Sequence, residues 1–260
     1  MPRMRLPLLL CAVLAVLPQG LGAQLVAGFR GPVRSADLLY YSGRPQDAFA
    51  LLEDHLEEWP DDYEALWRAA RSAVMLAIAA EGSRAQNAWL DPGIELAERA
   101  VATRPDGIDG LYWRGAAVGR RAMNAAPSYA ARLAQKVYDD AQAILAADPT
   151  HAGAHNLLGK LNYEVMTVSR IERAIGRLFM GNTVLREATW EDAEYHLLAA
   201  VRADPRLVRF QFDVAQLYRR RGREEDARRT LLTVLSLPSV HPTDLAVQAD
   251  ARSILAELEN

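Results

Sequence analysis

Prolines recur along the chain at the ends of apolar runs, and this recurrence limits the folds that the chain can adopt. Five apolar, helix-like runs each end in a proline, usually beside an aspartate, at Pro60, Pro105, Pro149, Pro205 and Pro238. The intervals between these prolines are 45, 44, 56 and 33 residues. Because proline cannot continue a helix, this recurrence predicts a series of helical hairpins.

The last unit shows the packing that we expect. Ala215 and Tyr218 fall on one face of a first helix, and Gly222 closes that helix. Ala227 begins the apolar stripe of a second helix that stops before Pro238. Small residues let two antiparallel helices approach closely. This pattern resembles the tetratricopeptide repeat, and it predicts an all-α, right-handed solenoid of helical hairpins with insertions and a C-terminal capping helix.

The phased repeats favour this solenoid over an unrelated all-helical bundle. We predict a signal peptide over residues 1–23, an extended lead-in over 24–33 and one helical-repeat domain over 34–260. The units fall at about 34–61, 62–106, 107–150, 151–205 and 206–239, before a cap over 242–260. The residues in excess of a simple repeat are expected in a loop over 81–90 and in insertions at about 120–128 and 164–189.

The N-terminus is typical of an export signal. Arg3 and Arg5 precede an uncharged apolar stretch over 6–17, and Ala23 offers the small residue that signal peptidase requires. The stretch is shorter than the roughly 20 residues that span a bilayer. We therefore expect an exported protein, periplasmic in a Gram-negative host, with no membrane span in the mature chain. An uncleaved anchor is the alternative.

Composition excludes several classes of protein. Without Arg3 and Arg5, 28 basic residues face 33 acidic ones, which gives the mature chain a net charge of −5. Cleavage would also remove Cys11, the one cysteine, and a cysteine-free chain suits an oxidising compartment. Nucleic-acid binding needs a basic excess, so no nucleic-acid partner is expected.

The sequence offers little that is typical of an enzyme or a metal site. His151 and His155 have a spacing that suits two metal ligands on one helix, but no third ligand is nearby, so packed or exposed histidines are expected. Carboxylate pairs such as Asp139 with Asp140 fit helix surfaces better than acid–base catalysis. With no glycine-rich phosphate loop and no nucleophile elbow, we expect no catalytic residues, no cofactor and no metal.

Arginines on the first helices are the stronger candidates for binding. In a solenoid of this kind the first helices line a concave groove, and guanidinium groups bind carboxylates or phosphates through paired hydrogen bonds. The alternative is that these arginines pair with nearby acids, as Arg223 is expected to do with residues 224–226. The groove candidates are Arg120, Lys160, Tyr163, Arg209, Arg219 and Arg220.

A closer resemblance lies in the C-terminal half. The segments 155–165 (HNLLGKLNYEV), 169–173 (SRIER), 178–181 (LFMG) and 189–200 (TWEDAEYHLLAA) resemble the regulator of microtubule dynamics proteins. The resemblance implies a tetratricopeptide-like domain with a long insertion in this unit. Eukaryotic members associate with microtubules near organelle membranes, and phospholipid binding is known in the family. An exported chain meets no tubulin, so we carry over only the fold and a binding groove.

Two functions follow as hypotheses. The first is a non-enzymatic scaffold or adaptor that holds a protein or peptide segment in its concave groove. The second is phospholipid or amphiphile binding by the groove and an apolar flap within the 164–189 insertion. A structural alternative for residues 170–173 is an internal ion pair that locks the insertion onto the stack. The insertion candidates are Arg170, Ile171, Glu172, Arg173, Leu178 and Phe179.

Overall fold

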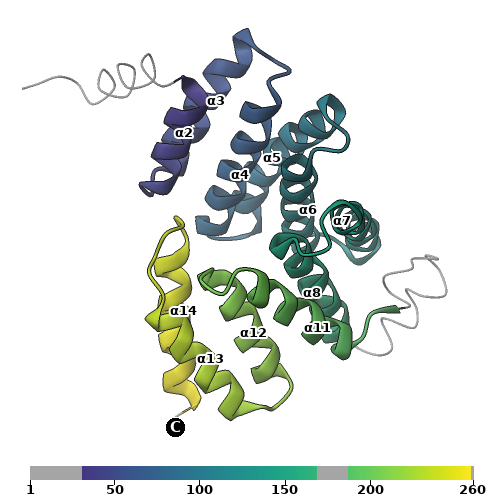
Figure 1. The fold of residues 1–260 in the computed structure, drawn as a ribbon, viewed down its shortest axis with the longest axis vertical. Coiled ribbons are helices and arrows are strands. Elements are labelled where there is room, and N and C mark those ends of the chain that lie inside the picture. Colours follow the sequence, from purple (N-terminus) through teal and green to yellow (C-terminus); the bar gives the residue numbers. More distant parts are fainter. Residues whose placement is uncertain (1–30, 169–186, 259–260) are drawn as a thin grey trace, which may run out of the picture.

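The computed structural model describes residues 31–168 and 187–258, and these ranges contain helices and turns but no strand. The helices pair into hairpins that follow one another around an arc (Figure 1). The first helices of the hairpins are α2 (Pro32–Tyr41), α4 (Tyr63–Ala79), α6 (Ile108–Met123), α8 (Ala152–Thr167) and α12 (Val208–Arg220). Their partners are α3 (Pro45–Glu58), α5 (Ser83–Thr103), α7 (Pro127–Ala147), α11 (Trp190–Ala203) and α13 (Glu224–Ser236). The predicted helical solenoid is confirmed.

Glycine closes the first helix of two hairpins. Gly43 and Gly222 have φ values of 80° and 70°, a left-handed conformation that side chains with a Cβ rarely adopt. The N–H of Gly222 donates to Arg219 O at 3.1 Å, and the next N–H, of Arg223, donates to Tyr218 O at 2.9 Å. This pair of bonds is the Schellman motif, which turns the chain back into the second helix.

The recurring prolines follow the ends of the second helices. Each second helix stops two residues before one of these prolines: α3, α5, α7, α11 and α13. The residue before proline is disfavoured in the α conformation, so each helix ends there. Aspartates organise the turns that follow: Asp62 caps α4 by accepting from the N–H groups of Glu64 and Ala65, and Asp204 accepts from the N–H of Arg206.

The predicted loop over 81–90 is wrong, because α5 begins at Ser83 and continues through Pro92. Tertiary contacts make this segment helical: Leu90 is fully buried, and Trp89 packs edge-on against Phe49 with 5.5 Å between ring centres. Pro92 removes only one amide donor from the helix, and those contacts outweigh its loss.

Two further boundaries differ from expectation. Arg120 and Met123 belong to the last turn of α6, so the third unit absorbs its extra residues by lengthening its helices. Pro32 and Val33, predicted in an extended lead-in, form the first turn of α2, where proline is favourable. The rest of the lead-in, the signal segment and residues 169–186 of the insertion lie outside the described residues.

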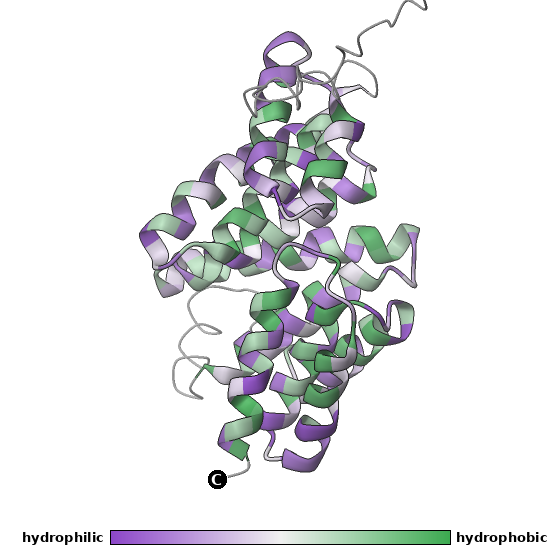
Figure 2. Cartoon of the chain, turned by 90° about the vertical axis from the view of Figure 1, so that its left-hand side faces the viewer, coloured by the Kyte–Doolittle hydropathy of each residue, from purple (hydrophilic) through white to green (hydrophobic). Residues whose placement is uncertain are grey.

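The core is a row of clusters rather than one centre. One cluster joins α2 to α5, others join α6 to α8 and α8 to α13, and a last one joins α12 and α13 to α14 (Asp244–Leu258). Hydrophobic and hydrophilic residues alternate along the individual helices, as expected of amphipathic helices (Figure 2). Helix α14 covers the end of the stack, as the predicted cap requires. Within the described residues, no helix is both long enough and apolar enough to cross a membrane.

The close contact of α8 with α11 gives a test of this packing. A Cβ added to Gly159 would lie 2.7 Å from Leu197 Cγ and 2.8 Å from its backbone N. We therefore expect Gly159→Ala to lower the free energy of unfolding by about 2 kcal/mol, because the helices must move apart.

Gly119 is the matched control, since it also lies within a helix but a Cβ there would meet only Val137 Cγ2 at 3.5 Å. Gly119→Ala should be neutral or stabilising by up to about 1 kcal/mol, because alanine favours the helix. Urea unfolding followed by circular dichroism measures both variants. Equal stabilities would show that this hairpin is not closely packed.

Candidate binding surface

The first helices of successive hairpins pack side by side and form a surface that we call the inner face: α2 on α4, α4 on α6, α6 on α8, and α8 on α12. A buried carboxylate lies where α8 meets α12. Asp213, on α12, has a side chain that is 3% exposed. It accepts a hydrogen bond from Asn156 Nδ2 at 3.0 Å, and Lys160 Nζ lies 3.7 Å from its other oxygen. Asn156 and Lys160 therefore offset the cost of burying this charge.

Lys160 lies between two acids. Its ammonium is 3.2 Å from Glu164 and 3.7 Å from Asp213. Burial works against its charge, but Asp213 and Glu164 outweigh burial and raise the pKa of Lys160. The ammonium also lies 5.0 Å from the ring centre of Tyr163, within range of a cation–π interaction.

Two arginines complete this group. Arg120 on α6 feels the charges of Arg209, Asp213 and Glu164, so α6, α8 and α12 converge here. Burial, and secondly the positive charge of Arg209, lower the pKa of Arg120. Within the described part of the chain, neither Arg120 nor Arg209 has a carboxylate oxygen within 4.0 Å. We call Arg120, Asn156, Lys160, Arg209 and Asp213 the inner cluster.

The other predicted groove residues lie elsewhere. Arg219 forms an ion pair with Glu257 of α14 at 2.6 Å, so it ties two helices together. Arg220 is exposed at the end of α12; burial raises the pKa of Tyr163, and the charges of Lys160 and Arg220 oppose that rise. Arg223 bonds to Asp226 and Glu194, which confirms its expected pairing. All six insertion candidates, from Arg170 to Phe179, lie outside the described residues.

Sequence reasoning missed Asp213 and Asn156. The signal for Asp213 was its position inside the apolar run 210–217 (FQFDVAQL), where a charged residue implies a buried partner. Asn156 lies one helical turn before Lys160 and shares its face. Neither pattern identifies the partner, because Asp213 is 57 residues from Asn156.

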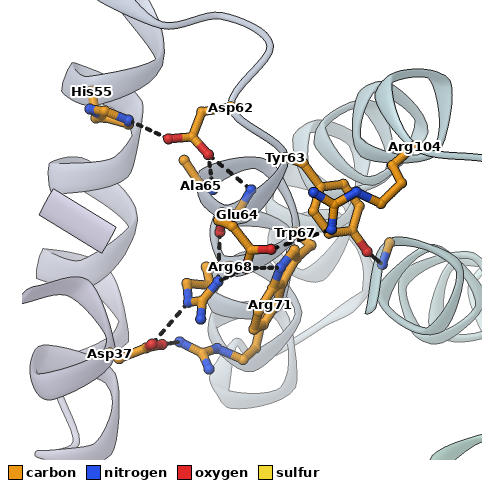
Figure 3. Close-up of polar contacts among 11 residues, drawn as sticks. Asp37, His55, Asp62, Tyr63, Glu64, Ala65, Trp67, Arg68, Arg71 and Arg104 are labelled. Atoms are coloured by element: carbon orange, nitrogen blue, oxygen red, sulfur yellow. Dashed lines mark hydrogen bonds and ion pairs between the residues drawn. The ribbon is translucent and has the colours of Figure 1, made fainter. Parts of the chain in front are cut away.

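A second polar network joins α2 to α4 (Figure 3). Asp37 accepts from Arg68 Nε at 2.9 Å and from Arg71 Nη2 at 2.6 Å. The Arg71 guanidinium lies 3.8 Å from the ring centre of Tyr40, and Glu64 binds Arg68 at 2.6 Å. These contacts fix the first hairpin on the second, and the sequence carried no signal for them.

His151 and His155, at the start of α8, form hydrogen bonds within the protein. His151 caps α8 by accepting from the N–H of Ala154 at 3.0 Å. His155 Nε2 lies 3.0 Å from Pro149 O, and because a carbonyl only accepts, this nitrogen donates. In the neutral ring its Nδ1 then accepts from His196 Nδ1, 2.9 Å away. Among the described residues, no three histidine, cysteine or acidic side chains gather in a group that could hold a metal ion.

Comparison with known proteins gives the chain its relatives. The family model "Regulator of microtubule dynamics protein 1-3" matches residues 33–259. Regulator of microtubule dynamics protein 3 of Rattus norvegicus is 24% identical over 215 residues, which cover 82% of this chain and 44% of that protein. The chain therefore spans less than half the length of this curated relative.

A solved structure has a similar fold. TTC0263, a thermophilic tetratricopeptide repeat protein of Thermus thermophilus, superposes with a TM-score of 0.64 at 21% identity. The match covers 87% of this chain and 98% of that one. At this identity the likeness establishes the tetratricopeptide-like fold.

The histidine pair predicts a pH dependence of stability. Burial, together with the nearby His155, lowers the pKa of His196 to about 4, whereas an unfolded histidine titrates near 6.5. Between these values the unfolded chain binds a proton that the folded chain does not, so stability should fall as the pH drops from 7 to 4. We expect a loss of about 2 kcal/mol after allowing for the partial exposure of the ring.

His196→Asn should remove this part of the loss, because its amide can donate to His155 Nδ1 without titrating. Urea unfolding of both proteins at pH 7, 6, 5 and 4 measures the difference. Parallel pH profiles would contradict the assignment.

Proposed function

The chain belongs to the regulator of microtubule dynamics family, and we propose that it is a non-enzymatic, exported helical-repeat module that binds a protein or peptide segment on its inner face. The observation that carries this proposal is the inner cluster. It places three cations around one buried carboxylate, Asp213, and two of them, Arg120 and Arg209, have no carboxylate within 4.0 Å in the described ranges.

Partly buried arginines that have no carboxylate within 4.0 Å in residues 31–168 and 187–258 favour an anionic partner. A guanidinium presents two parallel N–H groups that match a carboxylate, and a charge-assisted bond strengthens where water is scarce. The burial that lowers the pKa of Arg120 indicates such a place. An acidic side chain or a C-terminal carboxylate of a protein segment supplies the missing charge.

Aromatic side chains beside the cluster support a peptide as the bound group. Tyr112 on α6 is close enough to Asp213 and Arg209 to feel their charges, and burial, with the charge of Asp213, raises its pKa to about 12. Tyr163 is partly exposed, and its ring centre lies 5.0 Å from the Lys160 ammonium. Apolar rings next to fixed charges suit an extended segment that carries both kinds of side chain.

We do not propose a role on microtubules. The rat relative is named for that role, but the chain spans less than half of its length. Export, proposed from Arg3, Arg5, the apolar stretch 6–17 and Ala23, would also separate the chain from tubulin. Phospholipid binding stays a prediction, because the flap that would support it lies outside the described residues.

Removing the two arginines tests the binding proposal. We expect Arg120→Gln with Arg209→Gln to weaken binding of an acidic peptide at least tenfold, because each charge-assisted bond contributes about 1.5–3 kcal/mol. The probes are fluorescein-labelled ten-residue acidic peptides, each with a free or an amidated C-terminus, measured by fluorescence anisotropy.

Arg252→Gln is the matched control, since Arg252 is exposed on α14, and it should bind like the wild type. Thermal unfolding of each variant checks that the fold is intact. Equal affinities of the double variant and the control would overturn the proposal. A preference for free over amidated peptides would identify a C-terminal carboxylate as the bound group.

Export is tested separately. In a Gram-negative host, we expect the full chain to be released by osmotic shock and to lack residues 1–23 by intact-mass measurement. Deleting residues 2–23 should retain the protein in the cytoplasm. Retention of the full chain in the cytoplasm would contradict export, and an uncleaved, membrane-bound product would favour the anchor.

A further inference from the structure

The two ends of the solenoid meet. Figure 1 shows one end of α2 facing the chain that leads into α14. The His241 ring, in the connector between α13 and α14, lies 6.3 Å from the Tyr40 ring centre and 5.8 Å from that of Tyr41. These two tyrosines are the last residues of α2, so residues about 200 positions apart in sequence close the arc. We call the contact of His241 with Tyr40 and Tyr41 the seam.

On the α2 side of the seam, contacts with α4 fix the position of Tyr40. Tyr40 is 1% exposed and stacks on the Arg71 guanidinium at 3.8 Å. Arg71, on α4, donates in turn to Asp37 of α2 at 2.6 Å, so a hydrogen bond also joins this end of α2 to α4. The edge therefore keeps its shape whether or not the seam is closed.

The connector side is also fixed within itself. Asp244 Oδ2 accepts from the N–H groups of Val240 and His241 at 2.9 and 2.8 Å. Buried Gln248 donates to Leu237 O at 2.8 Å and to Val234 O at 3.1 Å. Hydrogen bonds within the connector and to α14 therefore fix the segment that carries His241.

The contacts within α2 and α4 differ in kind from the contact across the seam. Arg71 Nε is buried without a hydrogen-bond acceptor, and among the described residues it is the one side-chain polar atom in that position. Tyr40 and Tyr41 lie at 3.8 and 5.5 Å from the same guanidinium and cover it with apolar rings. Both rings belong to α2 and Arg71 belongs to α4, so Arg71 stays buried when the contact with His241 opens. Within the described ranges no hydrogen bond or ion pair links α2 to the connector or to α14, and the contact rests on rings alone, so its closure is reversible.

We propose that His241 with Tyr40 and Tyr41 forms a latch that opens and closes the inner face. Two preorganised edges joined by ring contacts make an element with two discrete states. When the latch is closed, a segment can reach the inner face only from the open sides of the arc. When it is open, a segment without a free end can enter between α2 and α14. This second part rests on the proposed function.

The latch itself is tested without any ligand. Leu38 on α2 and Leu245 on α14 are 48% and 70% exposed, so cysteines there accept spin labels in a Cys11→Ser background. Pulsed electron–electron double resonance should give mainly one short distance between the two spin labels in the otherwise wild-type chain. His241→Ala should increase the population at longer distances at least fivefold.

Three further variants make the test specific. His241→Phe keeps a ring and should stay closed, and Tyr41→Ala, at a position that is 52% exposed, should open like His241→Ala. Trp59→Ala removes an exposed aromatic ring far from the seam and should change nothing. Distance distributions that are equal in His241→Ala and the wild type, or a phenylalanine variant that opens, would overturn the latch.

Entry is tested with the acidic peptides used above. A bismaleimide joining Tyr41→Cys to His241→Cys should slow at least tenfold the association of an acidic peptide that carries a folded domain at each end, because such a segment cannot be threaded through the open sides. A short linear peptide should be unaffected. Equal association rates would overturn control of entry. If neither peptide binds the unlinked protein, the proposed function fails, whereas the spin-label result on the latch stands by itself.

Discussion

The close approach of the two helices within each hairpin is the contact on which the other features depend. In α8 the missing side chain of Gly159 leaves room for Leu197, and in the second hairpin Gly93 would bring a Cβ within 3.0 Å of Ala73. Apart from the contact of His241 with Tyr40 and Tyr41, the hairpins pack on their neighbours along the chain, so an altered spacing in one displaces those that follow. The inner cluster takes side chains from α6, α8 and α12, and it therefore needs two successive stacking contacts to be correct.

The inner cluster holds more cations than the burial of Asp213 requires. Burying Asp213 is offset by Asn156 and Lys160, and one cation would suffice for that purpose. Arg120 and Arg209 add two further cations; burial lowers the pKa of Arg120, and the positive charge of Arg209 lowers it further. Among the described residues no carboxylate pairs directly with these two arginines, which is unfavourable in the free protein and would become favourable in the anionic complex that we propose. Such local conflicts are typical of binding sites.

Local sequence signals predicted much of the fold, because they act within a few residues. Gly222 and the five prolines define helix ends through backbone geometry alone. The failures involve contacts between distant residues: burial of Leu90 keeps α5 helical through Pro92. The same limit applies to the surface, where helical spacing placed both Lys160 and Arg219 on first helices. Only the packed structure directs Lys160 to Asp213 and Arg219 outward to Glu257 of α14.

The charges of this chain therefore form two populations with different consequences. At the turn between α12 and α13, Arg219 and Arg223 bind acids of neighbouring helices in partly exposed pairs, which contribute about 0–1 kcal/mol each. At the inner cluster, burial makes each charge costly to leave unpaired and strongly favourable to pair. A net charge of −3 is thus a poor guide to what the chain binds, because charges on exposed surfaces are already screened by water and salt. The partly buried cations of the inner cluster are screened less than those on exposed surfaces, and the anionic partner that we propose rests on them.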